Sequence, residues 1–369
     1  MKQVSSKICV ILILVLITLL FSACEDLNSS KLEYEINVDG KTCTITGLGS
    51  YEGYELVIPE QIGGYTVTAI GDYAFRESEI ERVIMADTVV TIGKEAFSYC
   101  YYITDIELSD NLKTIGEGAF AYCSSLERIE IPGSVRILPE YLFYGSNSLK
   151  SVSLNEGLVR IKNAAFYDCA MLQEITFPST LQYIGEMAFA ECDALTEIVL
   201  PNGLIEFDFD IFSSCKNLST ISFPSSLRIV SIPFAAESHK LSTILVDSNS
   251  LYYKAVDGVL YDKTMTMLLC YPAGKEQTSF IIPDTVIEIY NCAFTSNKNI
   301  QIIYIPKSVK VIGPGVFAET VNLKELHYEG TIVEWNSISK DSQWNAQSPN
   351  FTIYCTDGQI SKGGTVTYN

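Results

Sequence analysis

Histidine is scarce in this sequence, which contains only His239 and His327 in 369 residues. Neither belongs to an H-E-x-x-H motif, and the sequence has no nucleophile elbow and no phosphate-binding glycine loop. Residues 208–210 (DFD) and 247–249 (DSN) are rich in oxygen ligands but lack the spacing of a calcium loop. We therefore expect no catalytic residues, no metal and no other cofactor, and we expect both acidic clusters to be solvated turns.

Positive charge is also sparse. Lys and Arg number 25 against 44 Asp and Glu, which gives a formal net charge of −19. A nucleic-acid-binding protein needs a basic surface, so this composition excludes nucleic acid as an expected partner. The sequence is nevertheless 47% hydrophobic and only 19% charged. A chain of this length and composition is expected to fold and to bury a core.

Long apolar runs are missing except at the N-terminus. There, residues 8–21 are apolar, follow Lys2 and Lys7, and end at the small residues Ser22 and Ala23. The run is shorter than the roughly 20 residues of a membrane-spanning helix. The pattern predicts an export signal over residues 1–23 that is removed from the mature protein.

The end of this signal, Phe21-Ser22-Ala23-Cys24, resembles a bacterial lipobox, although Phe21 stands where the motif usually has Leu. The resemblance implies that Cys24 is acylated after cleavage and that residues 24–33 form a polar tether. The protein would then be exported, lipid-anchored to the cell membrane and exposed at the cell surface. The alternative is an ordinary signal peptide cut near Ala23, with Cys24 unmodified.

One line of sequence is repeated along the chain. A phenylalanine returns every 22 or 23 residues, at Phe75, Phe97, Phe120, Phe143, Phe166, Phe189, Phe212 and Phe234, and again at Phe294 and Phe317. Each line continues with an I-x-I type segment such as residues 129–132 (IEIP), in which apolar and polar residues alternate as in a half-buried strand. The proline that often follows ends the strand, because it has no N–H to donate.

The repeat predicts a stack of coils. No segment keeps a helical period for ten residues, so we expect few long helices. A single coil cannot bury its apolar side, but neighbouring coils can do so by pairing their strands in parallel, about 4.8 Å apart. The repeated phenylalanines would then form a continuous internal spine.

A cysteine recurs three residues after the spine phenylalanine. The members of this set are Cys100, Cys123, Cys169, Cys192 and Cys215, with Ser146 in the sixth place. We interpret them as a ladder of small, buried, free side chains. Disulfides between neighbouring coils and a metal-binding thiol cluster are the alternatives, but stacked cysteines have poor disulfide geometry and no C-x-x-C pair or His partner is present.

The complete line, A-F-x-x-C-x-x-L-x-x-I-x-I-P-x-x-[VL]-x-x-I-G, resembles the repeats of the BspA-like class of bacterial surface leucine-rich repeat proteins. The resemblance covers about residues 34–358. It implies a leucine-rich-repeat solenoid of short parallel strands on a roughly 23-residue repeat, with β-rich caps. It also implies a cell-surface protein that mediates protein–protein interaction, in adhesion to host or bacterial surfaces.

Departures from the repeat suggest boundaries within the chain. We predict an N-terminal β cap, a first solenoid segment, a β-hairpin insertion with a turn at Asp257-Gly258, a segment of final repeats and a C-terminal cap. These parts comprise residues 34–71, 72–250, 251–280, 281–326 and 327–369. In the C-terminal cap, Trp335 and Trp344 are expected to pack over the last coil, and an aromatic sugar-binding platform is the alternative for them.

The outward positions of the strands form the predicted binding face. Its candidate residues are Asp105, Glu107, Arg128, Glu130, Glu174, Thr176, Glu197 and Thr220. Candidate aromatic contacts are Tyr101, Tyr102, Tyr122, Trp335 and Trp344. The strand positions could equally be a merely soluble sheet face, and the tyrosines could be half-buried corners. We expect an extracellular or envelope protein as the partner, with a glycan as the alternative partner and a structural envelope lipoprotein as the alternative role.

Overall fold

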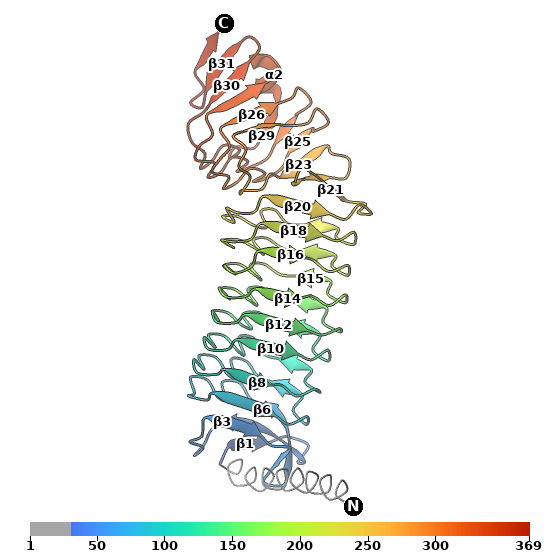
Figure 1. Cartoon of the computed structure of the whole chain (residues 1–369), viewed down its shortest axis with the longest axis vertical. Coiled ribbons are helices and arrows are strands. Elements are labelled where there is room, and N and C mark those ends of the chain that lie inside the picture. The colour runs from blue at the N-terminus through green and yellow to red at the C-terminus, as the bar shows by residue number, and fades with distance from the viewer. Residues whose placement is uncertain (1–30) are drawn as a thin grey trace, which may run out of the picture.

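The computed structural model describes residues 31–369, which wind into an elongated solenoid of stacked coils (Figure 1). Cys24, the predicted signal peptide and most of the predicted tether lie outside the described residues. The solenoid fold predicted from the repeat is confirmed, with parallel strands at a spacing of about 23 residues. Among the described residues the helix α2 (Ile332–Ser337) is six residues long, as expected for a fold with few long helices.

Each coil contributes one longer strand to a parallel sheet along the solenoid. These strands are β3 (Glu55–Ile58), β6 (Arg82–Met85), β8 (Asp105–Glu107), β10 (Arg128–Ile131), β12 (Ser151–Leu154), β14 (Glu174–Thr176), β16 (Glu197–Val199), β18 (Thr220–Phe223) and β20 (Thr243–Val246), followed by β24 (Ser279–Ile281), β26 (Ile302–Ile305), β28 (Glu325–Tyr328) and β30 (Thr352–Cys355). Each strand residue pairs with the residue at the same place in the next repeat, so Arg128 lies beside Ser151 and Ser151 lies beside Glu174. Side chains in the same place of successive repeats therefore form rows along the axis.

The second strand of each coil is shorter and forms a separate parallel row. Its members are β5 (Tyr65–Ile70), β7 (Thr91–Ile92), β9 (Thr114–Ile115), β11 (Ile137–Leu138), β13 (Arg160–Ile161), β15 (Tyr183–Ile184), β17 (Glu206–Phe207) and β19 (Ile229–Val230), then β23 (Met267–Cys270), β25 (Glu288–Ile289), β27 (Val311–Ile312) and β29 (Ser339–Lys340). The two rows enclose the apolar interior, to which most of their strands contribute at least one buried residue, such as Ile115 of β9 and Ile129 of β10.

The phenylalanine spine lies in the tight turns that close each coil. Six consecutive pairs from Phe75 to Phe212 stack with ring centroids 5.0–5.8 Å apart, and every ring is buried. Stacked aromatic pairs add about 0.5–1.5 kcal/mol each beyond the area they bury. The predicted spine is therefore confirmed as the central contact between coils.

An antiparallel hairpin divides the solenoid into two stacks. β21 (Tyr253–Val256) and β22 (Val259–Asp262) pair with each other, and β22 pairs antiparallel with β23. We call the coils from β3 to β20 the N-terminal stack and those from β23 to β30 the C-terminal stack. The spine resumes at Tyr271, whose ring stacks on Phe294 at 5.1 Å and which stands 23 residues before it. The sequence analysis, which followed phenylalanine alone, did not identify Tyr271 as a spine residue.

Both ends of the described chain are closed by antiparallel strands. At the N-terminal end, β1 (Glu33–Ile36) pairs with β2 (Thr42–Gly47), and β4 (Gln61–Ile62) pairs with β5. At the C-terminal end, β31 (Gly358–Ser361) pairs with β30, and β32 (Val366–Tyr368) pairs with β31. The Trp344 ring centroid lies 6.0 Å from that of Phe317 and 5.9 Å from that of Trp335, so Trp344 packs against the last spine ring and Trp335 packs behind it.

Candidate binding face

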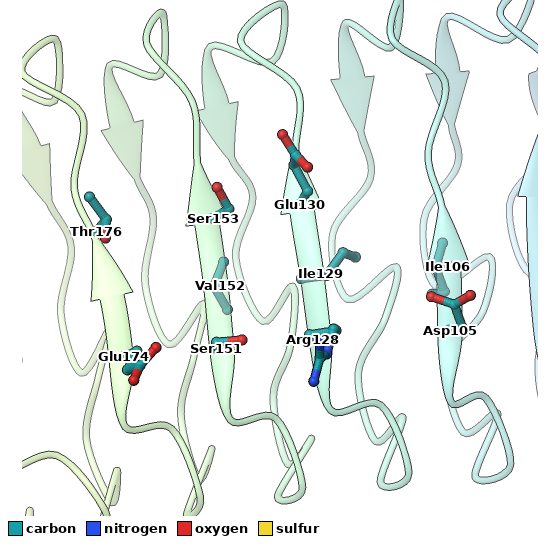
Figure 2. Close-up of a pocket in the computed structure, with 10 residues that line it drawn as sticks. All are labelled: Asp105, Ile106, Arg128, Ile129, Glu130, Ser151, Val152, Ser153, Glu174 and Thr176. Atoms are coloured by element: carbon teal, nitrogen blue, oxygen red, sulfur yellow. The ribbon is translucent and has the colours of Figure 1, made fainter.

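A shallow hollow lies on the outer face of the longer strands. It spans β8, β10, β12 and β14 and has a volume of about 410 Å³. Figure 2 shows the ten residues that line it, with polar side chains on either side of a middle strip. The strip is formed by Ile106, Ile129 and Val152, whose side chains are only 3–6% exposed because they point to the opposite, buried face of the strands.

Two rows of polar side chains border this strip. One row runs Arg128, Ser151 and Glu174, and the other runs Glu130, Ser153 and Thr176. Each row combines carboxylate, hydroxyl or guanidinium groups from successive coils. Hydroxyl and charged groups on a rigid frame can donate and accept hydrogen bonds at fixed spacing, which suits recognition of another polar surface.

The hollow crosses a discontinuity in the sheet. Among the described strands, β3, β6 and β8 form one hydrogen-bonded group and β10, β12 and β14 form the next, with no ladder between β8 and β10. The two strands remain neighbours without the usual backbone pairing. Edge strands carry unpaired N–H and C=O groups, so this seam adds main-chain hydrogen-bonding capacity to the hollow.

Some charged side chains around the hollow already have hydrogen-bond or ion-pair partners, and others do not. Arg128 makes no ion pair within 4.0 Å in the part of the chain that the structure describes, whereas the Glu130 carboxylate accepts a hydrogen bond from Asn155 Nδ2 at 3.0 Å. At the other side, Arg82 Nε lies 3.2 Å from Asp105 Oδ2, and the same guanidinium contacts Glu107. Hydrogen bonding to Glu107 raises the pKa of Arg82. Two of the predicted acidic residues are thus already paired, while Arg128 and Glu174 remain available.

The sequence analysis missed Arg82 as a member of this face. The repeat spacing could have identified it, because Arg82 stands 23 residues before Asp105 and therefore lies in the same row. The remaining predicted face residues, Glu197 on β16 and Thr220 on β18, lie further along the same face of the solenoid, in the next hydrogen-bonded group of strands and outside the hollow. Val199 beside them is 72% exposed, so this part of the face is more apolar.

The predicted aromatic contacts do not form one cluster. Tyr101 and Tyr102 are 49% and 56% exposed in a coil corner, and Tyr122 lies half-buried in the turn after a spine phenylalanine. Trp335 is only 3% exposed because α2 packs it against Tyr328 and Trp344. Its inclusion among the surface contacts was therefore wrong, and its expected packing in the C-terminal cap is what the structure shows.

The same face changes character in the C-terminal stack. His327 occupies an outward position of β28, its ring 5.0 Å from that of Tyr304 and 4.9 Å from that of Tyr354. Its Nε2 lies 2.6 Å from Glu325 Oε2. The C-terminal stack thus presents an aromatic row where the N-terminal stack presents charges and hydroxyls.

The cysteine ladder is buried, as predicted, and its members form no disulfide in the structure. Each of its five thiols donates a hydrogen bond to the carbonyl of the spine phenylalanine one coil earlier, with sulfur to oxygen distances of 3.0–3.3 Å. Ser146 and Ser238 do the same at 2.9 Å and 2.7 Å. Burial raises the pKa of Cys215 to about 12, so this thiol stays protonated at neutral pH. The donor role was missed, although Ser146 in the same place indicated it.

Within residues 31–369, no group of three or more His, Cys, Asp or Glu residues is arranged to hold a metal ion. In the same range, no helix has the length and apolar character needed to span a bilayer. His239 lies in the turn region after Phe234, where burial lowers its pKa.

Two solved structures resemble the molecule over most of its length. A leucine-rich cell-surface protein from Faecalibacterium prausnitzii is 24% identical, with a TM-score of 0.50 over 85% of this chain and 97% of its own. A leucine-rich repeat protein from Bacteroides ovatus is 23% identical, with a TM-score of 0.54 over 88% of this chain and 98% of its own. Both similarities concern the fold. No curated protein matches the sequence.

The family comparison covers most of the repeats. The sequence model of the BspA type leucine-rich repeat region matches residues 68–171, 136–255 and 271–350. These ranges include the spine, the cysteine ladder and the rows of outward strand residues described above. The chain therefore belongs to the family of BspA-type leucine-rich repeat proteins.

Proposed function

We propose that the protein is a lipid-anchored cell-surface protein that binds a protein partner through the hollow on strands β8, β10, β12 and β14. The observation that carries this proposal is the alignment of charged and hydroxyl side chains in two rows on the outward face of these strands. Extended faces of stacked repeats are the usual binding surfaces of solenoid proteins. The hollow is open and shallow, which fits a protruding surface element of a protein better than an enclosed small molecule.

The chemistry of the partner follows from the charges of the hollow. Glu174 lies in one row with Ser151 and Arg128, and Glu130 lies in the other row with Ser153, so the two carboxylates are on opposite sides of the strip. A partner that places basic side chains next to one of these two carboxylates would be electrostatically complementary to the hollow. The protein's net charge of −19 would further favour approach of a basic surface.

The surface location is supported by two separate observations. Residues 1–24 carry the pattern of an export signal that ends in a lipobox-like Cys24. The structurally similar protein from Faecalibacterium prausnitzii is described as a cell-surface protein. Adhesion to a host or bacterial surface is the role we propose for a binding scaffold held at that location.

The anchor is tested by the substitution Cys24→Ser. We expect the variant to move from the membrane fraction to the soluble fraction of the envelope or the medium, since the acyl chains would be absent. Cys43→Ser, which changes a buried cysteine of the described fold, is the matched control and should leave the protein in the membrane fraction. A Cys24→Ser protein that stays fully membrane-bound would disprove the lipid anchor.

The partner class is tested by binding the full chain to one array that carries extracellular proteins and glycans. Saturable binding to a protein, weakened by Glu174→Lys, would support the proposal. Binding to glycans alone would favour a carbohydrate-binding accessory protein, and binding to neither would favour a structural envelope lipoprotein. Because Trp335 is buried, the glycan alternative would depend on Tyr101 and Tyr102 as exposed stacking surfaces.

A further inference from the structure

A second surface runs along the edge of the solenoid formed by the tight turns around the spine phenylalanines. In seven successive coils the residues two before and two after the phenylalanine have a positive φ. The members are Tyr73, Glu95, Gly118, Tyr141, Ala164, Met187 and Asp210 before it, and Glu77, Tyr99, Tyr122, Gly145, Asp168, Glu191 and Ser214 after it. These two left-handed residues turn the chain sharply on either side of the buried ring. The resulting edge is separate from the strand face, so the inference drawn from it does not depend on the proposed function.

Tyrosine rings follow one another along this edge, with Tyr99–Tyr122 and Tyr144–Tyr167 stacked and Tyr122–Tyr144 edge-on. The ring centroids of Tyr99 and Tyr122 are 4.6 Å apart, those of Tyr122 and Tyr144 are 5.4 Å apart, and those of Tyr144 and Tyr167 are 4.9 Å apart. All four side chains are half-buried, so each keeps part of its surface accessible. We call these four residues the tyrosine row.

A hollow of about 300 Å³ opens beside the first three rings of the row. Small residues make room for it, namely Ser98, Gly118 and Ala121, and Tyr141 closes one side. Glu95 and Glu117 supply carboxylates, and the lining found within residues 31–369 includes no Lys and no Arg. Aromatic faces beside carboxylates form a favourable environment for a cation.

The protein itself places one cation in such an environment. The guanidinium carbon of Arg76 lies 5.2 Å from the centre of the Tyr99 ring, and Arg76 Nη1 is 3.2 Å from Glu95 Oε2. Arg76 directly follows its spine phenylalanine. In the next two coils Ser98 and Ala121 occupy that place, so the chain has no side chain there that could reach the next rings. The first coil thus shows how a cation sits on this row.

Further along the same edge the surface becomes acidic. A second hollow, of about 200 Å³, is bordered by Tyr167, Glu191, Asp210 and Glu237. Burial and the neighbouring carboxylates of Glu191 and Asp193 raise the pKa of Asp168. A cation bound here would relieve this crowding of negative charge, because opposite charge favours the ionised carboxylates.

We propose that this edge binds an extended, basic segment of a partner protein. Lys or Arg side chains of the segment would cover Tyr122 and Tyr144 as Arg76 covers Tyr99, and others would pair with Glu191, Asp210 and Glu237. The two hollows extend over six coil steps, or about 29 Å at a spacing of about 4.8 Å per coil. An extended segment of about nine residues covers that length.

Two existing ion pairs would have to adjust. Lys94 Nζ lies 3.2 Å from Glu117 Oε1, and Lys216 Nζ lies 2.6 Å from Asp193 Oδ2. Exposed ion pairs of this kind contribute only about 0–1 kcal/mol, so an incoming cation can share or replace them at small cost. Neither lysine lines either hollow.

The test uses the full chain and a fluorescent nonapeptide of alternating Arg and Gly, with binding followed by anisotropy. The control peptide carries citrulline in place of Arg, which keeps the shape and removes the charge. We expect the Arg peptide to bind saturably, with an affinity that falls as salt is added. We expect the citrulline peptide to bind at least about tenfold more weakly. Equal binding of both peptides, or no binding of the Arg peptide, would overturn the proposal.

Variants locate the binding on this edge. Glu191→Gln with Asp210→Asn should weaken binding of the Arg peptide about tenfold, whereas the matched pair Glu276→Gln with Asp284→Asn, which removes two exposed acids elsewhere, should not. Tyr122→Leu should also weaken it, and a circular dichroism melt would confirm that this variant is folded. Equal losses in both double variants would assign the binding to net charge alone. Competition by a soluble oligosaccharide would assign the row to a glycan, and either result would contradict the proposal.

Discussion

The N-terminal and C-terminal stacks have the same coil geometry but different interior side chains. In the N-terminal stack, phenylalanine rings stack in six consecutive pairs, and cysteine or serine donates to the phenylalanine carbonyl of the coil before. In the C-terminal stack the spine is Tyr271, Phe294 and Phe317, and the last pair is tilted by 35°. The donors there are Asn297, which reaches Pro272 O at 3.0 Å, and Thr320, which bonds its own coil.

The two stacks together show what the position three residues after the spine ring requires. Cysteine, serine, asparagine and threonine share a compact side chain that can donate a hydrogen bond, and all are buried in this place. A buried carbonyl without a partner would cost about 1–3 kcal/mol. The repeated requirement is therefore a small donor, and sulfur is one way to meet it.

The largest expected effect comes from removing a spine ring. Phe166→Ala should lower the free energy of unfolding by about 3–5 kcal/mol, because Phe166 stacks on Phe143 at 5.3 Å and on Phe189 at 5.0 Å. Phe317→Ala should fall at the lower end of that range, since only one of its neighbours is a spine ring. Denaturant unfolding of both variants would measure the difference. A larger loss for Phe317→Ala would contradict the greater weight we give to the N-terminal spine.

A smaller effect is expected from the donor position. Ser146→Ala should cost about 1–3 kcal/mol, because Ser146 Oγ donates to Phe120 O and also accepts from the Cys123 amide at 3.2 Å. Ser146→Cys, which restores the residue found in five other coils, should cost less than half as much. Equal losses for the two variants in the same unfolding assay would show that the donor is unimportant.

Alkaline pH should distinguish a thiol from a hydroxyl at this position. Burial raises the pKa of Cys215 to about 12, so the folded state favours the protonated thiol. The stabilisation is complete below the thiol's ordinary pKa near 9 and is lost as the pH rises toward 12, because the unfolded chain ionises first. Cys215→Ser should therefore lose about 1 kcal/mol less stability than the native protein between pH 8 and pH 10. Parallel unfolding curves at the two pH values would contradict this.

The smallest effect concerns the left-handed residue two before the spine ring. Ala164 has a φ of 52° in the N-terminal stack, and Gly315 has a φ of 59° at the same place in the C-terminal stack. Ala164→Gly should stabilise the fold by up to about 0.5 kcal/mol, because relief of strain slightly exceeds the added entropy of the unfolded chain. Gly315→Ala should destabilise it by about 1 kcal/mol. Thermal melts of both variants would test whether the signs are opposite.

Much of the fold could be predicted because the repeat determines it. The 23-residue spacing places like residues side by side, so the spine, the strand rows and the buried cysteines followed from counting. Tyr271 was missed because the expectation was built on phenylalanine, and the hairpin before it breaks the count. The positive φ values were missed because ordinary residues such as Tyr99 and Glu95 adopt them and carry no local signal for a left-handed turn.

The binding face could be predicted only in part. The rows of Arg128 and Glu130 followed from strand alternation, which fixes the direction of each side chain. The hollow crosses the missing ladder between β8 and β10, which the repeat does not foretell, and the pairing of Arg82 with Asp105 depends on side-chain reach. Burial of Trp335 depends on the packing of α2 against the last coil. Repeat spacing alone contains none of these three facts.

The central claim is that a protein partner binds the hollow of the N-terminal stack. The most direct measurement compares the affinity of the identified partner for the full chain carrying Glu174→Lys with its affinity for the chain carrying Glu206→Lys. Glu206 lies on β17 in the shorter-strand row. Its substitution by Lys changes the charge by the same amount as Glu174→Lys, but outside the hollow. We predict at least a tenfold loss for Glu174→Lys and less than a twofold loss for Glu206→Lys. Equal losses, or a greater loss for Glu206→Lys, would contradict the account.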